Sequence, residues 1–250
     1  MARNRGSRRR RRGRFAFLFK LLSFFIIVGA IVAALTLFFK MEHIAVTGNQ
    51  RYTEQEVLDA SGLHTGDNLY LMNKYAVKEA IFSSLPYVEN VSINRKLPDT
   101  LLIEIRESRP AAALQSEQSI WLVSPEGKLL EETGVAPENC PRVLGVMLEE
   151  PAAGAQAVFP EEEAYRVQVL FTLLSAAEER GMIEQIAQID LSDETALHFD
   201  YLGRFTVQVP WTSDIGYKLT SLKRTVESLE DNQTGRIDLM TDGKSRFIPN

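Results

Sequence analysis

The chain has 250 residues, of which 45% are hydrophobic and 24% are charged, and its formal net charge at pH 7 is −5. Its single cysteine, Cys140, excludes an internal disulfide, so the stability of the fold must come from packing. The three histidines (His43, His64 and His198) are far apart in sequence and none stands in a metal-ligand spacing, so no metal site is predicted.

The modest net charge hides a division of the chain into two parts of opposite charge. Ten of the 28 basic side chains lie in residues 1–40, where there is no acidic side chain. Residues 41–250 therefore hold 18 basic side chains against 33 acidic ones. Near the boundary, residues 21–39 (LLSFFIIVGAIVAALTLFF) contain no charge at all.

This apolar run is long enough to cross a membrane once, since 19 residues form a helix of roughly 28 Å. Phe15 to Phe19 lengthen it, and Lys20 can extend its ammonium group toward the headgroups, so residues 15–39 are predicted to be a transmembrane signal anchor. The positive-inside rule predicts that residues 1–14 form a basic cytoplasmic segment facing anionic lipid. The large acidic part then lies outside the cytoplasm.

Two other interpretations of the amino-terminal part are weaker. A cleaved secretory signal has an apolar core of about 7 to 15 residues and a small-x-small cleavage site, whereas this run is longer and ends in bulky side chains. A nucleic-acid-binding arm would use the arginines on phosphates, but interleaved aromatic residues are missing here.

Residues 42–110 have the pattern of a βααββ unit. Thr53 followed by Glu56 predicts a helix that starts with a capping box, and Gly62 predicts its end. Apolar and polar residues alternate in 100–107, which is typical of a strand with one buried face, and we expect both helices to cover that face. The predicted elements are a strand at 44–47, helices at about 53–61 and 73–85, and strands at 88–95 and 100–107.

Residues 111–248 are predicted to form a second unit, richer in strands and containing two helices. A loop rich in alanine, from 149 to 160, leads into the first helix, whose end is predicted at Gly181. The predicted strands lie at 111–115, 120–123, 128–131, 140–144, 186–191, 196–201, 204–209 and 235–239, and the helices at about 161–180 and 214–229.

No catalytic constellation emerges from the sequence. Adjacent glutamates, such as Glu131 and Glu132, could act as paired carboxylates in glycoside hydrolysis, but they are typical of a solvated surface. Cys140 with His198 could form a nucleophile and base, but no protease signature surrounds them. The run Gly243-Lys244-Ser245 lacks the upstream glycine of a phosphate-binding loop, since position 238 is Asp238. We therefore expect a binding protein rather than an enzyme, without cofactor or metal.

Several short runs follow the anchor in a fixed order: His43-Ile44-Ala45-Val46-Thr47-Gly48-Asn49, Gly66-Asp67-Asn68-Leu69, Leu85-Pro86-Tyr87-Val88 and Arg95-Lys96-Leu97-Pro98-Asp99-Thr100-Leu101. In this order and spacing they resemble the POTRA domain of the FtsQ/DivIB bacterial cell-division proteins. Two runs of the second unit, residues 121–128 and 237–239, resemble the β domain of that family. The implied fold is α+β: a single transmembrane helix, a βααββ POTRA domain at 42–110 and a mixed β-sheet domain with two or more helices at 111–248.

The resemblance implies a non-catalytic divisome scaffold in the cell membrane at the division septum. Such a protein crosses the membrane once, binds the FtsL and FtsB/DivIC proteins outside the cytoplasm, and links early and late septation components. It has no small-molecule substrate and no nucleic-acid partner.

The resemblance also implies where these partners bind: the final strands of the β domain add a partner strand at a free sheet edge. This chain departs from the family at Met240 and Thr241, where an arginine and an aromatic residue often stand, and at Ser108, where a basic residue is usual. The alternative is that these residues only complete the sheet. The expected contact residues are Met240, Thr241, Asp242, Gly243, Lys244, Ser245, Arg246 and Phe247.

Two rival functions remain open at this point. A POTRA unit also occurs in membrane assembly or secretion components, but further repeats or a β-barrel follow it there, whereas only about 140 residues follow it here. An anchored cell-wall hydrolase is the second rival, which turnover of peptidoglycan by the protein would decide.

Overall fold

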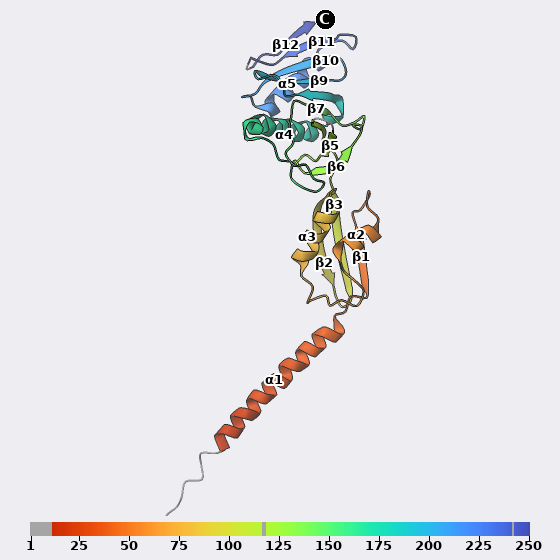
Figure 1. Ribbon diagram of the computed structural model, residues 1–250, viewed down its shortest axis with the longest axis vertical. Coiled ribbons are helices and arrows are strands. Elements are labelled where there is room, and N and C mark those ends of the chain that lie inside the picture. Colours follow the sequence, from red (N-terminus) through yellow and green to blue (C-terminus); the bar gives the residue numbers. More distant parts are fainter. Residues whose placement is uncertain (1–11, 117–118, 242) are drawn as a thin grey trace, which may run out of the picture. The chain divides into compact units, whose positions relative to one another are not determined.

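The computed structural model describes residues 12–116, 119–241 and 243–250. The chain divides into two compact units, one made of Met1–Ala80 with Val91–Ile105 and the other of Ile81–Asn90 with Arg106–Asn250. The described part contains a three-stranded and a nine-stranded sheet together with α-helices (Figure 1). This architecture confirms the predicted α+β class. Most of the predicted basic segment at 1–14 lies outside the described residues.

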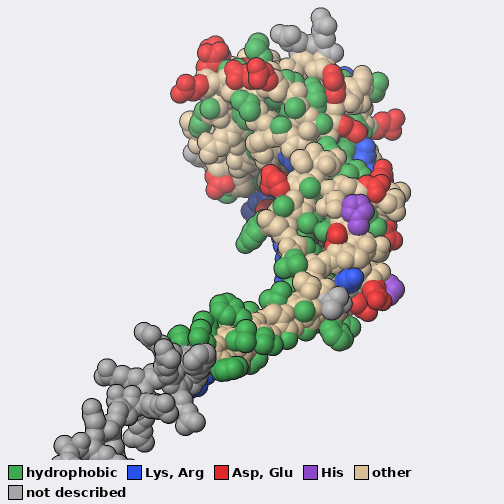
Figure 2. All heavy atoms as spheres, turned by 60° about the horizontal axis from the view of Figure 1, so that its bottom comes forward, with side chains coloured by type: hydrophobic (Ala, Val, Ile, Leu, Met, Phe, Trp, Pro, Cys, Tyr) green, Lys and Arg blue, Asp and Glu red, His purple; other side chains and the backbone are tan. Residues whose placement is uncertain are grey.

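Helix α1 spans Arg12–Phe38 and contains most of the predicted anchor. Its segment Phe17–Ala34 has a mean hydropathy of 2.5, and none of that segment is buried. Figure 2 shows hydrophobic side chains covering this helix along its exposed length. A helix satisfies its own backbone hydrogen bonds, so by length and composition α1 can cross a bilayer core. It is the one helix in the described part of the chain that meets these requirements.

The three-stranded sheet has the order β1-β3-β2, with β1 parallel to β3. In β3 the side chains of Leu101, Ile103 and Ile105 are buried, while Glu104 and Arg106 are exposed, as the alternation predicts. The helices add buried side chains to the same unit's interior. The elements are β1 (His43–Thr47), α2 (Glu54–Ser61), α3 (Lys74–Ser84), β2 (Val88–Lys96) and β3 (Thr100–Glu107).

Local sequence signals set the bounds of α2. The hydroxyl of Thr53 accepts a hydrogen bond from the Glu56 amide, and the Glu56 carboxylate accepts one from the Thr53 amide at 2.7 Å. Gly62 closes the helix with a φ of 66°, in the left-handed region. The capping box and the glycine end that the sequence predicts are therefore both confirmed.

The nine-stranded sheet has the order β12-β11-β10-β9-β8-β7-β4-β5-β6. Three of its pairs are parallel, namely β4 with β7, β7 with β8, and β10 with β11. The strands are β4 (Ala112–Ser116), β5 (Ser119–Val123), β6 (Leu129–Thr133), β7 (Arg142–Leu144), β8 (Ile186–Asp190), β9 (Ala196–Tyr201), β10 (Phe205–Pro210), β11 (Gly235–Asp238) and β12 (Arg246–Pro249).

Helices α4 (Ala164–Glu179) and α5 (Ile215–Glu227) pack their apolar side chains into one core with this sheet. Leu170 and Leu174 of α4 and Leu219 and Leu222 of α5 are buried in that core. The helix predicted from residue 161 instead begins with a 3-10 turn over Glu161–Glu163, in which the Glu163 amide bonds to the Pro160 carbonyl. Such turns are frequent at helix amino termini. A second 3-10 turn covers Ile183–Gln185.

Candidate functional site

The strand β12 lies at one end of the nine-stranded sheet and pairs only with β11 among the described residues. The two strands are antiparallel, with Asp238 opposite Arg246 and Ile237 opposite Phe247. The turn between them contains most of the residues that the resemblance assigns to partner binding. The strand itself was not predicted as separate from the one at 235–239.

Hydrogen bonding in β11 determines which backbone groups of β12 face outward. The amides of Gly235 and Leu239 donate to carbonyls of β10 or just before it, at 3.1 and 2.9 Å. Because successive residues of a strand point their backbone groups to opposite sides, residues 236 and 238 face β12 and bond Ile248 and Arg246. The N–H and C=O of Phe247 therefore point away from the sheet. Pro249, which has no N–H, occupies a position typical of an edge.

Close packing holds β12 against β11. The ring of Phe247 meets the ring of Phe205 edge to face, with centroids 6.1 Å apart. A Cβ atom at Gly235 would stand 2.2 Å from the carbonyl oxygen of Ile248, so only glycine allows this approach. The core contact of Phe247 and the glycine together fix the edge strand in place.

A buried lysine supports the turn that leads into β12. Lys218 of α5 is only 2% exposed, and its Nζ donates to the carbonyl of Leu239 at 2.6 Å and to that of Thr241 at 3.3 Å. Nearer the strand, the hydroxyls of Ser245 and Thr225 lie 2.6 Å apart. Both interactions connect α5 to the turn, so the helix positions the edge strand.

The structure therefore brings the predicted contact residues into one turn and one strand. Arg246 and Phe247 belong to β12, while Met240, Thr241 and residues 243–245 belong to the turn before it. Asp242 lies outside the described residues. The outward-facing edge continues two residues beyond the predicted site, to Pro249. Lys218 and Thr225 were missed, although Lys218 stands on the inward face of α5 at helical spacing from Ile215 and Leu222.

The opposite edge of the sheet, β6, is covered at its start by the loop of residues 154–157. The Leu129 amide donates to the Ala155 carbonyl and the Gly154 amide donates to the Leu129 carbonyl, both at 2.8 Å. The Ala157 amide adds a third bond, to the Gly127 carbonyl, also at 2.8 Å. The chain thus hydrogen-bonds to its own strand here as a further strand would.

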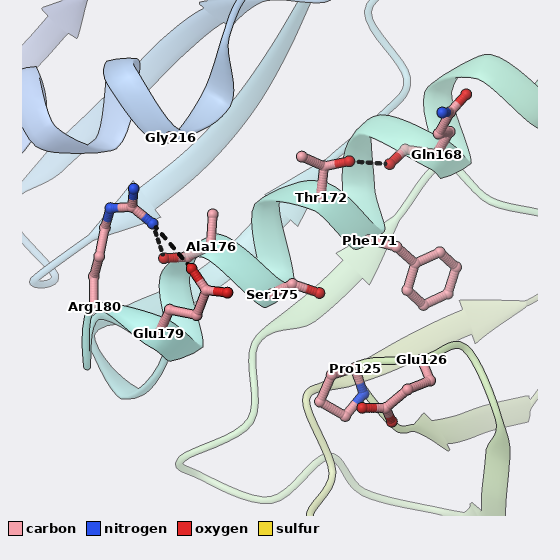
Figure 3. Close-up of a pocket in the computed structure, with 10 residues that line it drawn as sticks. All are labelled: Pro125, Glu126, Gln168, Phe171, Thr172, Ser175, Ala176, Glu179, Arg180 and Gly216. Atoms are coloured by element: carbon pink, nitrogen blue, oxygen red, sulfur yellow. Dashed lines mark hydrogen bonds and ion pairs between the residues drawn. The ribbon is translucent and has the colours of Figure 1, made fainter.

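A hollow of about 700 Å³ lies along α4, between that helix, the Pro125–Glu126 turn and Gly216 of α5. Figure 3 shows Phe171 projecting from α4 toward the turn, and Arg180 at the carboxyl end of the helix. The Arg180 guanidinium is already paired, since its Nη1 donates to the Ala176 carbonyl at 2.8 Å and lies 3.8 Å from the Glu179 carboxylate. Among these lining residues, no hydroxyl is hydrogen-bonded to a side chain that could act as its base.

Cys140 and His198, considered above as a nucleophile and base, each lie in an environment that is described by its own contacts. Burial raises the pKa of Cys140 to about 11, which keeps its thiol protonated at neutral pH. His198 Nε2 lies 2.9 Å from the Asp193 carboxylate. Hydrogen bonds from Thr195, and then from His198, hold the pKa of Asp193 well below its usual range. No three His, Cys, Asp or Glu side chains gather as metal ligands in the part of the chain that the structure describes.

Comparison with known proteins gives one match to the region of the smaller sheet and others that extend over most of the chain. The family model described as "POTRA domain, FtsQ-type" matches residues 39–108. The cell division protein DivIB of Clostridium botulinum (strain Hall) is 26% identical over 236 residues, which cover 91% of this chain and 90% of that protein. DivIB of Clostridium acetobutylicum is 25% identical over 208 residues, covering 82% and 81%. The cell division protein FtsQ of Corynebacterium glutamicum is 35% identical over 89 residues, covering 36% and 40%.

These similarities agree with the order of elements observed here. The POTRA match includes all three strands of the smaller sheet and the two helices, α2 and α3, that lie between β1 and β2 in the chain. The DivIB similarities extend over most of both chains, and so reach well beyond the residues of the POTRA match. The FtsQ-type POTRA match and the DivIB similarities together support the FtsQ/DivIB family of bacterial cell-division proteins for this chain.

Proposed function

We propose that this protein is a non-catalytic scaffold of the divisome that binds FtsL and FtsB/DivIC-like membrane proteins outside the cytoplasm. It links early and late components of septation and is located at the division septum. Binding occurs by addition of a partner strand to the outer edge of β12. Main-chain hydrogen bonds then supply affinity, and side chains at alternate positions supply specificity.

The observation that carries this proposal is the difference between the two edges of the large sheet. The start of β6 is hydrogen-bonded to the chain's own loop, whereas β12 has no second strand beside it among the described residues. Exposed edges are usually blocked because they pair with other chains. A firmly held edge strand with open outer backbone groups is suited to pair with a strand from a partner protein.

The proposed topology follows from the charge division. Residues 1–14 are cytoplasmic and contact anionic lipid, α1 crosses the membrane as a signal anchor at 15–39, and the POTRA domain at 42–110 and the β domain at 111–248 lie outside. A single spanning helix of suitable length supports this arrangement.

Replacing Ser245 by proline tests the strand addition. Continuing the alternation of β12 by one residue points the Ser245 amide outward, and proline removes that donor. We expect Ser245→Pro to weaken binding to an FtsL–DivIC pair by about tenfold, corresponding to one lost hydrogen bond of about 1.4 kcal/mol. Binding is measured by titration of the full-length protein in detergent.

Ser245→Ala is the matched control, because it loses the hydroxyl bonded to Thr225 but keeps the outward amide. Its affinity should stay within about twofold of the native value. Equal affinity of Ser245→Pro and Ser245→Ala would contradict strand addition at this position. Depletion of the protein in cells tests the wider role, and normal septation after depletion would contradict it.

A further inference from the structure

The end of α1 is attached by hydrogen bonds to the loop of residues 66–70. The Leu69 amide donates to the Phe39 carbonyl at 2.9 Å, the Met41 amide to the Asp67 carbonyl at 2.7 Å, and the Gly66 amide to the Met41 carbonyl at 2.8 Å. Leu69 and Met41 are both fully buried. The segment that leaves the apolar helix is therefore part of the folded unit rather than a free linker.

This attachment fixes the depth of the loop relative to the apolar span. Phe39 is the last residue of the apolar run and Lys40 is the first charge after it. The ring of Tyr70 meets the ring of Phe39 edge to face, with centroids only 4.9 Å apart. If α1 crosses a bilayer, Tyr70 must lie within a few ångströms of the depth at which the hydrocarbon ends.

The exposed apolar side chains of this unit gather at the same end. Within residues 41–110, the exposed large hydrophobic side chains are Tyr70, Leu71, Tyr75 and Leu97. Leu97 belongs to the turn between β2 and β3, whose Asp99 carbonyl accepts hydrogen bonds from the Glu42 and His43 amides just after α1. Tyr70 belongs to the loop bonded to Phe39, and Leu71 and Tyr75 come after it in the chain. Scattered surface hydrophobics need no explanation, but a set confined to one end indicates a contact surface.

Basic side chains stand among these apolar ones. Lys40, Lys74, Arg95 and Lys96 lie in the same segments, and the Arg95 guanidinium is 5.3 Å from the centre of the Tyr70 ring. Desolvation, and then the charge of Arg95, lower the pKa of Lys74, so positive charge is crowded here. Two of the nearby acids serve the fold, because the Asp67 carboxylate accepts from the His64 amide and the Asp99 carboxylate from the Thr100 hydroxyl, whereas Glu42 is exposed beside Lys40.

We propose that this end of the unit, formed by residues 38–40, 68–75 and 95–99, rests in the headgroup layer of the membrane that α1 crosses. Tyrosine rings suit this layer because one end is apolar and the other polar, and lysine and arginine bind lipid phosphates there. The surface continues directly from the spanning helix, so the lipid leaflet is its occupant. The membrane contact holds the unit at a fixed height above the bilayer.

The test uses the full chain in lipid nanodiscs with no other protein. In a Cys140→Ala background, Leu71→Cys and Val135→Cys each carry an environment-sensitive fluorophore; these two positions are matched, being 74% and 75% exposed. Lipids with a nitroxide close to the headgroup act as the quencher. We expect at least about half of the emission at position 71 to be quenched and about a tenth or less at position 135.

Equally weak quenching at both positions would overturn the proposal. Leu97→Cys provides a second position on the same surface, so the proposal stays testable if the first variant does not fold. If the fluorophore at position 71 became shielded from water only after another membrane protein was added, the proposal would also be overturned. That result would identify the surface as a protein contact. The inference does not depend on the strand addition proposed for β12.

Discussion

The two edges of the nine-stranded sheet are managed in opposite ways. At the start of β6, residues 154–157 donate and accept hydrogen bonds that a neighbouring strand would otherwise make, and Glu131 and Glu132 place charge on the strand itself. At β12, by contrast, the stabilising contacts lie on the inner side of the strand, and its outer backbone groups are open. These contacts are the close approach at Gly235, the ring contact of Phe247 and the hydrogen bond from Lys218 to the preceding turn.

An unprotected edge risks pairing with any available chain, so its retention has a cost in aggregation. In this protein the supporting contacts lie on the inner side of β12, where they do not obstruct its outer side. The open edge at β12 is therefore held in place by specific contacts. Substitutions that loosen β12 or uncover β6 test this difference between the two edges separately.

The largest effect is expected from Gly235→Ala. The new methyl group would stand 2.2 Å from the Ile248 carbonyl oxygen, a backbone atom, so β12 must move away from β11. We expect the free energy of unfolding to fall by about 3 kcal/mol. Urea denaturation measures this change, and partner binding should be lost with it.

Gly134→Ala is the control for this substitution at the other end of the sheet, because a Cβ atom there meets nothing within 4 Å. The free energy of unfolding of the control should change by less than about 0.5 kcal/mol. Similar losses in both variants would show that β12 is not held by the close approach at Gly235.

A smaller effect is expected from Lys218→Met, which leaves the Leu239 and Thr241 carbonyls without their charged donor. Loss of these bonds, partly offset by removal of a buried charge, should lower the free energy of unfolding by about 2 kcal/mol. Lys223→Met on the same helix changes an exposed lysine and should cost less than about 0.5 kcal/mol. Equal costs would contradict the supporting role of Lys218.

The smallest effect is expected at the covered edge, from Gly154→Ala. Gly154 has a φ of 84°, so an added Cβ should cost about 1 kcal/mol and loosen the loop over β6. Hydrogen exchange of the Leu129 amide should then become faster. Gly181→Ala introduces comparable strain, at a φ of 64° after α4, and should leave that exchange rate unchanged. Unaltered exchange in Gly154→Ala would show that the loop does not protect β6.

Local features of the fold could be predicted from the sequence because they depend on neighbouring residues. The capping box at Thr53, the alternation in β3 and the apolar span of α1 are all examples. The strand order could not be predicted, because the parallel placement of β7 between β4 and β8 depends on contacts between distant segments. Such pairings leave no periodic signal in either segment.

The candidate site was predictable only in outline. The resemblance indicated residues 240–247, but not that a turn and a separate strand divide them. β12 is four residues long, too short for its alternation to be distinguished from an irregular tail. The support from Lys218 required the structure, since a lysine on an amphipathic helix is ordinarily solvent-exposed.

The order of the large sheet also bears on how it assembles. From β7 to β12, every strand lies beside the next one in the chain. Three of these five pairings, β8 with β9, β9 with β10 and β11 with β12, are antiparallel and close short loops, which lowers the entropic cost of those steps. The parallel pairs β7 with β8 and β10 with β11 are instead connected through α4 and α5. A partner strand added to β12 would extend this series by one more step, so complex formation would resemble the final stage of folding, completed by a second polypeptide.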